Sequence, residues 1–299
     1  MSSHATFGSE RTPANFLRDV GAAAKAAGVL ADPKAIAFAF APFADLFCSC
    51  PVELRTTSVS EAERDVSFRF VDERARGNVW STARDWFGLT GAPRDFMDAV
   101  QRTFELAAEG IDADVRTGFR KAWAFLAAGH PAERFAQLAS APSALKAAGD
   151  ILARHGLTHF SIVGTDHHNA TCNLYPMLQP GWATPQSVQE LAASLDLAPM
   201  DETWLQWIER SVAANVTFSW STGQVERLSF YRPAMSLEEV PDDPALRRFA
   251  TECPALPPQR VCIPSIAYAR KGHYRKVEVD YDGGIVGVLV RCTQVPIAD

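Results

Sequence analysis

The sequence lacks the features that would place the protein in a membrane, in a secretory pathway or on a nucleic acid. Its 299 residues contain no uninterrupted run of about 20 apolar side chains, the length that a bilayer-spanning helix needs. Its start has neither the basic nor the apolar segment of a secretory signal. Lys and Arg total 29 against 35 Asp and Glu, and they form no basic cluster. We therefore expect neither a membrane nor a nucleic acid as partner.

Cysteine is also scarce. The 6 cysteines follow no disulfide-framework spacing, and the close pair of Cys48 and Cys50 has no second pair at the distance of a zinc site. Free thiols indicate a reducing compartment, so we expect a cytoplasmic protein. No Gly/Ser-rich or Pro-rich linker divides the chain, and 47% apolar residues can fill a large core. We expect a monomer with a single domain over residues 1–299.

What the sequence does contain is a repeat. Apolar residues at helical spacing alternate with short segments of period two, and the order helix, helix, hairpin recurs five times at intervals of roughly sixty residues. The predicted helices cover 14–29, 33–43, 82–87, 93–109, 131–138, 144–155, 186–195, 202–208 and 244–251. The predicted strands cover 53–58, 65–71, 113–117, 120–126, 158–165, 171–175, 212–220, 224–231, 265–270 and 274–281.

Consecutive antiparallel hairpins predict an α+β fold in which ten strands close into a barrel and the helices cover its outside. Along each strand one phase is apolar, which suits contact with helices. The other phase is polar or aromatic, and it predicts a solvent-filled lumen that binds a ligand. We expect the acidic residues mainly in the helices and turns. The inward phase includes Ser67, Arg69, Lys121, Trp123, Phe125, Asn173, Tyr175, Asn215, Thr217, Arg227, Ser229, Tyr231, Lys276 and Glu278.

Four segments in register resemble strands of a known family, the soluble aromatic prenyltransferases with the ABBA (PT-barrel) fold. The segments are 117–125 (TGFRKAWAF), 166–175 (DHHNATCNLY), 221–231 (STGQVERLSFY) and 272–278 (GHYRKVE), and the likeness covers nearly the whole chain. It extends to the clorobiocin-type, naphthoquinone-type and phenazine-type members. The resemblance implies transfer of a dimethylallyl group from dimethylallyl diphosphate to a ring carbon of an electron-rich aromatic, in secondary metabolism.

The resemblance also implies roles for individual residues. Glu278 stands where clorobiocin-type enzymes carry a Glu that activates or deprotonates the acceptor, while Trp123 and Phe125 match positions beside the allyl chain. Ser67 replaces the Mg²⁺-bound Asp of a metal-dependent relative, so we expect no obligatory Mg²⁺ and no other cofactor. The diphosphate-binding positions are Arg55, Arg69, Lys121, Asn173, Tyr175, Arg227 and Lys276.

The chemistry of these residue types agrees with that reaction. Arg and Lys can stabilise a diphosphate leaving group, aromatic faces can stabilise an allylic cation, and a carboxylate can accept the proton of a Friedel-Crafts substitution. Small and apolar residues leave room for a bicyclic or tricyclic acceptor, and we favour phenazine-like and naphthol-like rings. The prenyl and acceptor pocket is predicted to comprise Ser67, Trp123, Phe125, Ile162, Gly164, Ala213, Asn215 and Tyr231.

Two other classes remain open at the sequence level. A non-catalytic barrel could bind an amphipathic aromatic carboxylate, with the cations pairing with its acid group. A metal-dependent lyase or hydrolase is suggested by the run Asp166-His167-His168, although companion motifs are missing and a turn with surface histidines is the simpler interpretation.

Overall fold

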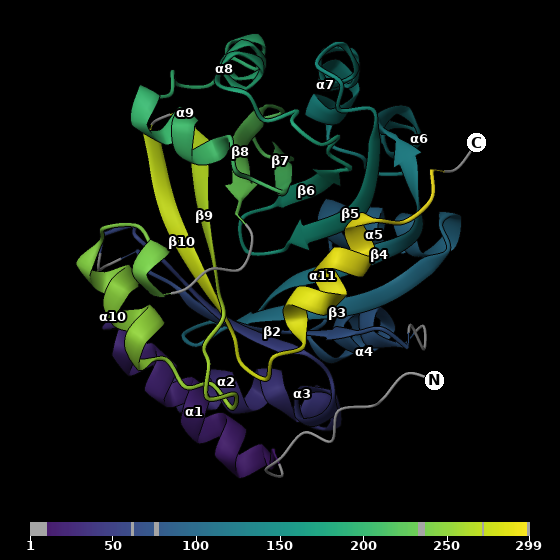
Figure 1. Cartoon of the computed structure of the whole chain (residues 1–299). Coiled ribbons are helices and arrows are strands. Elements are labelled where there is room, and N and C mark those ends of the chain that lie inside the picture. The colour runs from purple at the N-terminus through teal and green to yellow at the C-terminus, as the bar shows by residue number, and fades with distance from the viewer. Residues whose placement is uncertain (1–10, 61–62, 75–77, 233–236, 271, 298–299) are drawn as a thin grey trace, which may run out of the picture.

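Ten antiparallel strands pair in chain order, and β1 pairs with β10 to close them into a barrel (Figure 1). The predicted ten-stranded barrel is therefore confirmed. This computed structural model describes residues 11–60, 63–74, 78–232, 237–270 and 272–297. The strands are β1 (Val52–Thr57), β2 (Val66–Asp72), β3 (Leu106–Asp114), β4 (Gly118–Pro131), β5 (His159–Asp166), β6 (Thr171–Pro176), β7 (Ala213–Ser219), β8 (Val225–Tyr231), β9 (Cys262–Ala269) and β10 (Gly272–Asp280).

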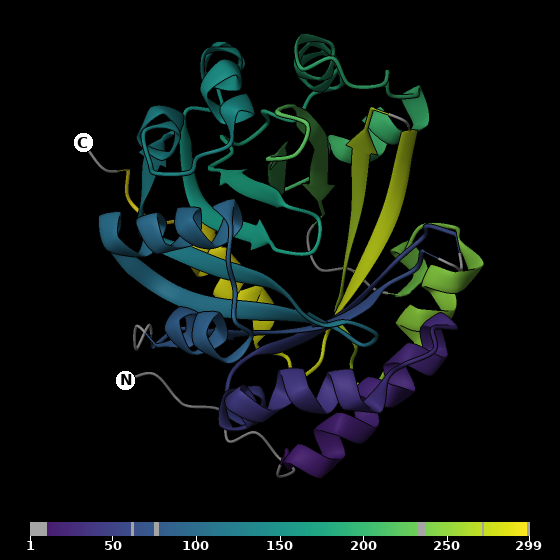
Figure 2. The ribbon, with the colours of Figure 1, turned by 180° about the vertical axis from the view of Figure 1, so that it is seen from behind.

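Most of the helices cover the outside of this barrel (Figures 1 and 2). Local capping sets several of their ends. The Thr12 side chain accepts the N–H of Asn15 at the start of α1, and Gly28 ends that helix in the left-handed region at φ 71°. The helices are α1 (Pro13–Ala27), α2 (Pro33–Phe40), α3 (Ala44–Ser49), α4 (Val79–Trp86), α5 (Ala92–Thr103), α6 (Ala132–Ala136), α7 (Ser143–Arg154), α8 (Pro185–Ser194), α9 (Glu202–Ile208), α10 (Pro244–Glu252) and α11 (Ile285–Thr293), with 3-10 turns at Ala41–Phe43 and Leu237–Glu239.

The main hydrophobic core lies between the outer helices and the outward face of the strands. Phe68 and Phe70 of β2 face Phe47 of α3, with ring centroids 5.2 and 4.8 Å apart. Phe16 of α1 stacks on the same Phe47 at 5.2 Å. All of these rings are fully buried, so the apolar strand phase is used against the helices, as the alternation predicts.

The end of one predicted helix and the position of the strand after it differ from the prediction. The predicted helix over 93–109 is wrong in its second half, because α5 ends at Thr103 and β3 runs from Leu106 to Asp114. The predicted strand over 113–117 is wrong for the same reason, since 115–117 form the hairpin turn. Residues 106–109 include Ala and Glu, which favour helices, but β3 pairs along its length with β2 and β4. Tertiary pairing here overrides local propensity.

The helix α11 was not predicted, and it is the one that shapes the lumen. It contacts β4 and β5, and it lies on the side of β3 and β4 opposite to α4 and α5 (Figures 1 and 2). Ile285, Val288 and Cys292 pack in a separate cluster with the inward-facing Trp123 and Phe125. The helix α11 therefore covers one end of the lumen from inside the ring of strands.

Candidate active site

The lumen contains two cavities, one after the other along the length of the strands. On β4, Lys121 lines the smaller cavity, whereas Trp123 and Phe125 line the larger one. On β10 the same order holds, with Lys276 in the smaller cavity and Glu278 in the larger. Side chains two residues apart on one strand face the same way, so the two cavities are neighbours along the barrel axis.

The smaller cavity, of about 110 Å³, is lined by five cationic side chains. Four of them, Arg55, Lys121, Arg227 and Lys276, were predicted to bind diphosphate. The fifth, Arg120, was missed because strand alternation assigns it to the outer face. The pairing of β3 with β4 places Asp112 opposite Lys121 but Ala113 opposite Phe119, so Arg120 is the extra residue of a β-bulge. The bulge directs its side chain into the cavity.

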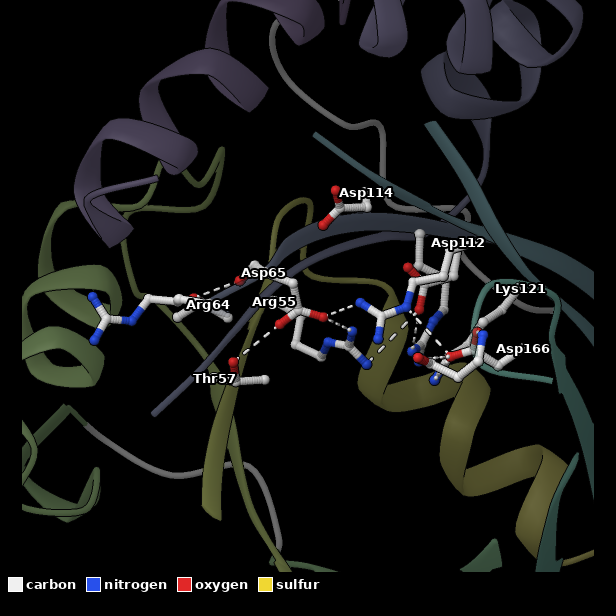
Figure 3. Close-up of polar contacts among 12 residues, drawn as sticks. Arg55, Thr57, Arg64, Asp65, Asp112, Asp114, Lys121 and Asp166 are labelled. Atoms are coloured by element: carbon white, nitrogen blue, oxygen red, sulfur yellow. Dashed lines mark hydrogen bonds and ion pairs between the residues drawn. The ribbon is translucent and has the colours of Figure 1, made fainter. Parts of the chain in front are cut away.

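Buried carboxylates hold these cations in place. Asp65 pairs with Arg55 at 3.0 Å and also with Arg120, and it accepts the Thr57 hydroxyl at 3.0 Å (Figure 3). Asp166 pairs with Arg120 at 3.3 Å and with Lys121 at 3.5 Å. The acidic residues were expected mainly in helices and turns, and these two carboxylates were not identified from the sequence as part of the site. They reduce the net positive charge while fixing the directions of Arg55, Arg120 and Lys121.

Three cations in the smaller cavity are incompletely compensated. Burial lowers the pKa of Lys121 to about 7, against the opposing effect of Asp166. Burial and the neighbouring Arg227 and Arg55 lower the pKa of Lys276 well below its ordinary value. In the part of the chain that the structure describes, Arg227 forms no ion pair, and its Nε is buried without a hydrogen-bond partner. An anion of high charge placed among these groups would relieve their mutual repulsion.

The larger cavity, of about 380 Å³, is lined mainly by aromatic and aliphatic side chains. Trp123, Tyr175 and Tyr231 form a row with ring centroids 5.7 and 5.9 Å apart. The guanidinium of Arg69 lies 4.3 Å from the Trp123 ring. These rings offer π faces at the end of the cavity next to the cations, where a carbocation would form.

Hydrogen bonds and a glycine fix the positions of these rings. The Tyr175 and Tyr231 hydroxyls lie 3.2 Å apart, and the Asn215 amide donates to Tyr231 at 2.9 Å. A Cβ at Gly164 would lie 2.7 Å from a ring atom of Trp123, so only glycine leaves space for this indole on the neighbouring strand.

Glu278 lines the larger cavity and forms no hydrogen bond or ion pair with any residue that the structure describes. Among the described residues, Glu278 forms no ion pair with Lys276, which lies two residues before it on β10. Its neighbour Glu53 was missed in the sequence. Burial raises the pKa of Glu53 against the opposing effect of Arg69, 2.7 Å away, and Glu278 adds to the rise. A buried carboxyl with a raised pKa therefore lies close to a carboxyl that has no partner.

The structure divides the predicted diphosphate residues between different places. Arg69 and Tyr175 line the larger cavity rather than the smaller one. Asn173 is buried and accepts the Thr217 hydroxyl at 2.6 Å. Five of the predicted prenyl and acceptor residues line the larger cavity: Trp123, Phe125, Ile162, Ala213 and Tyr231. The other three, Ser67, Gly164 and Asn215, are buried and do not line it.

The suggestion of a metal motif at 166–168 has no structural counterpart. Throughout the described ranges, no group of three or more His, Cys, Asp and Glu side chains is arranged to hold a metal ion. His168 is exposed at the predicted turn, but the expectation of a surface position is wrong for His167, which packs between Trp80 and Phe119 at 5.7 and 5.4 Å.

A ring of five antiparallel hairpins with helices outside and a polar, aromatic lumen defines the class of ABBA prenyltransferase barrels. A solved 6-dimethylallyl tryptophan synthase superposes with a TM-score of 0.59 at 14% identity, covering 91% of this chain and 96% of that one. For the 5-dimethylallyltryptophan synthase from Streptomyces coelicolor the TM-score is 0.55 at 14% identity, covering 92% and 99%. At such identities the likeness shows the fold alone.

The chain belongs to the aromatic prenyltransferase family described as "Aromatic prenyltransferase Orf2", whose profile matches residues 12–292. It is 24% identical over 63% of its length to the furaquinocin biosynthesis prenyltransferase of Streptomyces sp. strain KO-3988. It is 26% identical over 61% of its length to the 5,10-dihydrophenazine-1-carboxylate 9-dimethylallyltransferase of Streptomyces anulatus. The matched part spans 63% of each of these relatives.

Proposed function

We propose that the protein transfers a dimethylallyl group from dimethylallyl diphosphate to a ring carbon of an electron-rich aromatic acceptor. The observation that carries this proposal is the arrangement of the lumen. A small cavity lined by five cations adjoins a larger aromatic cavity that contains an unpartnered carboxylate. The first suits a diphosphate, and the second suits an allyl group stacked on an aromatic ring.

The reaction uses the two cavities together. The cations stabilise the charge that grows on the diphosphate as its bond to the allylic carbon breaks. Trp123, Tyr175 and Tyr231 flank the resulting cation, each worth up to about 2 kcal/mol when desolvated, and the closed lumen keeps water away. The acceptor ring then forms the new carbon–carbon bond. Glu278 accepts the proton that the ring loses, which restores aromaticity.

For the acceptor we propose a phenazine-like or naphthol-like ring system. The larger cavity has a volume of about 380 Å³, which is enough for fused rings, and apolar side chains such as Ile162 and Ala213 line it. A relative that acts on 5,10-dihydrophenazine-1-carboxylate supports this choice.

We propose that no metal ion is required. Arg55, Arg120 and Arg227 present guanidinium groups to the smaller cavity, and these match phosphate oxygens in geometry and charge. They can supply the charge neutralisation that Mg²⁺ supplies elsewhere.

We further propose that residues 1–299 form one domain that acts as a monomer in the cytoplasm. All six cysteines are free thiols, which fits a reducing compartment. No helix in the described ranges combines the length and apolar character that a bilayer crossing needs.

The test is incubation with dimethylallyl diphosphate and a panel of naphthols, dihydrophenazines and phenols in the presence of EDTA. We expect a prenylated product and an equal amount of released diphosphate, measured by mass spectrometry and a coupled diphosphate assay. Binding without turnover across the panel would instead support a non-catalytic barrel. Activity that EDTA abolishes and Mg²⁺ restores would contradict the metal-independent mechanism.

A further inference from the structure

Besides Arg69, a second cation lines the larger cavity of the lumen. Arg232 follows directly after β8 and is only 7% exposed. It lines the larger cavity beside aliphatic residues such as Val212 and Leu289. Its guanidinium carbon lies 4.9 Å from the ring centroid of Trp207 in α9, which restricts its orientation.

This guanidinium lacks the partner that a buried charge normally has. Across the residues that the structure describes, no carboxylate contacts Arg232, and its buried Nε has no hydrogen-bond partner. The nearby Glu239 pairs instead with Arg210 at 3.9 Å. Burial and the neighbouring Arg210 lower the pKa of Arg232, against the opposing effect of Glu239. Burying an unpaired charge is costly, so this position is explained better by a ligand group than by the stability of the fold.

The partner of Arg232 is not the diphosphate. Arg227 lines the smaller cavity and Arg232 the larger one, and five residues of strand separate them by roughly 16 Å. A diphosphate bound among the first group of cations therefore occupies the other cavity. The intervening space holds the allyl group and the acceptor ring, so a group that meets Arg232 belongs to the far side of the acceptor.

We propose that Arg232 recognises a carboxylate on the aromatic acceptor and so selects acidic acceptors. This inference rests on the proposed function and narrows its substrate class to fused-ring aromatic acids. A carboxylate fits because a guanidinium can bind both its oxygens. The pairing also orients the ring, because one edge is held at Arg232 while the opposite edge faces the allyl group and Glu278.

The test compares three acceptors that differ in one group: a dihydroxynaphthalene, the corresponding dihydroxynaphthoic acid and the methyl ester of that acid. Affinity is measured by calorimetry without prenyl donor, and kcat and KM are measured with dimethylallyl diphosphate. The proteins are the parent chain, Arg232→Gln, Arg232→Lys and the control Arg247→Gln, whose side chain is 53% exposed on α10. Thermal melts check that each variant folds.

We expect the parent chain to bind the acid at least tenfold more tightly than the ester. Arg232→Gln should reduce that preference at least tenfold, mainly through KM, while Arg232→Lys keeps part of it and Arg247→Gln keeps it all. Equal affinity for acid and ester, or equal losses for both in Arg232→Gln, would overturn the inference. Turnover of all three acceptors without preference would refute the role of Arg232 and leave the proposed function intact, whereas binding preference without turnover would refute the proposed function alone.

Discussion

At the scale of single residues, some charged side chains of the lumen have ion-pair partners and others have none. Arg55 and Arg120 are held by Asp65, whereas Arg227 has no ion-pair partner among the described residues. Glu278 has none either. Groups that are buried and unpaired in the lumen are the ones that a ligand would pair with, so substitutions there should affect the reaction most.

The first prediction concerns Arg227. Arg227→Ala should lower kcat/KM by at least a hundredfold, because the variant loses a charge that stabilises the leaving diphosphate. Steady-state kinetics with dimethylallyl diphosphate measure this effect. Arg247→Ala is the matched control, since Arg247 is 53% exposed on α10. Turnover of Arg227→Ala within a few-fold of the parent chain would exclude the role in leaving-group stabilisation.

The second prediction concerns Glu278. Glu278→Gln should lower kcat by a factor on the order of 10² or more, because the amide cannot accept the proton. The affinity for an unreactive thiodiphosphate analogue of the donor should stay within a few-fold, because Glu278 lines the other cavity. Single-turnover kinetics and calorimetry separate the two effects. A parallel loss of donor binding and rate would show that the carboxylate supports the fold of the site.

The third prediction is that donor binding takes up protons. Burial lowers the pKa of Lys121 to about 7 in the protein alone, and a bound diphosphate, ionised above a pKa near 6, should raise it. The complex then binds more protons than the free protein, so affinity should fall as pH rises above 7, by up to roughly tenfold per unit for one proton. Calorimetry of the thiodiphosphate analogue in buffers of different ionisation enthalpy counts the protons. A binding enthalpy that does not depend on the buffer would contradict the prediction.

At the scale of elements, two irregular features complete the site. The bulge in β4 turns Arg120 into the lumen, and α11 covers the larger cavity with Val286, Leu289 and Val290. Neither follows the ααββ repeat. A regular barrel would lack the fifth cation of the smaller cavity, and the acceptor end would be open to water.

The fourth prediction therefore addresses α11. Leu289→Trp should fill part of the larger cavity and raise KM for a fused-ring acceptor at least tenfold, while donor affinity changes little. The control is Arg291→Gln on the same helix, whose side chain is 60% exposed and pairs with Glu73. Kinetics with one bicyclic and one monocyclic acceptor measure the effect. An equal change for both acceptors would mean that α11 does not limit the size of the acceptor.

At the scale of the whole molecule, the fold gathers positive charge inside a chain whose net charge is −6. The cationic cavity is built inside an acidic protein, which suits one small anion and disfavours a polyanion. The same burial makes the fold sensitive to acid. Although burial acts to raise it, pairing with Arg55 and Arg120 holds the pKa of Asp65 below its usual range. Such a group contributes stability above its unfolded pKa near 3.9, and this stability is lost as the pH falls through its folded pKa.

The fifth prediction is a loss of stability that starts at milder pH. Burial lowers the pKa of His167 to about 4, whereas an unfolded His titrates near 6.5. The unfolded chain therefore binds an extra proton between pH 6.5 and 4, and the free energy of unfolding falls by up to roughly 1.4 kcal/mol per pH unit. Urea denaturation across this range measures the slope. His167→Gln should flatten it, while the exposed His168→Gln should not; equal slopes in all three proteins would contradict the assignment.

The sequence by itself determined the repeat, the closed barrel and the polar lumen, because strand alternation and helical spacing depend on near neighbours in the chain. That is why Lys121, Trp123 and Phe125 were correctly placed on one inward face. Only the tertiary structure decided what depends on pairing between distant segments. It set the register that places Arg120 in a bulge, the covering of the lumen by α11, and the lack of an ion pair between Arg232 and any described carboxylate. Register, covering and charge pairing are relations across the barrel, and residue spacing along one strand carries no information about them.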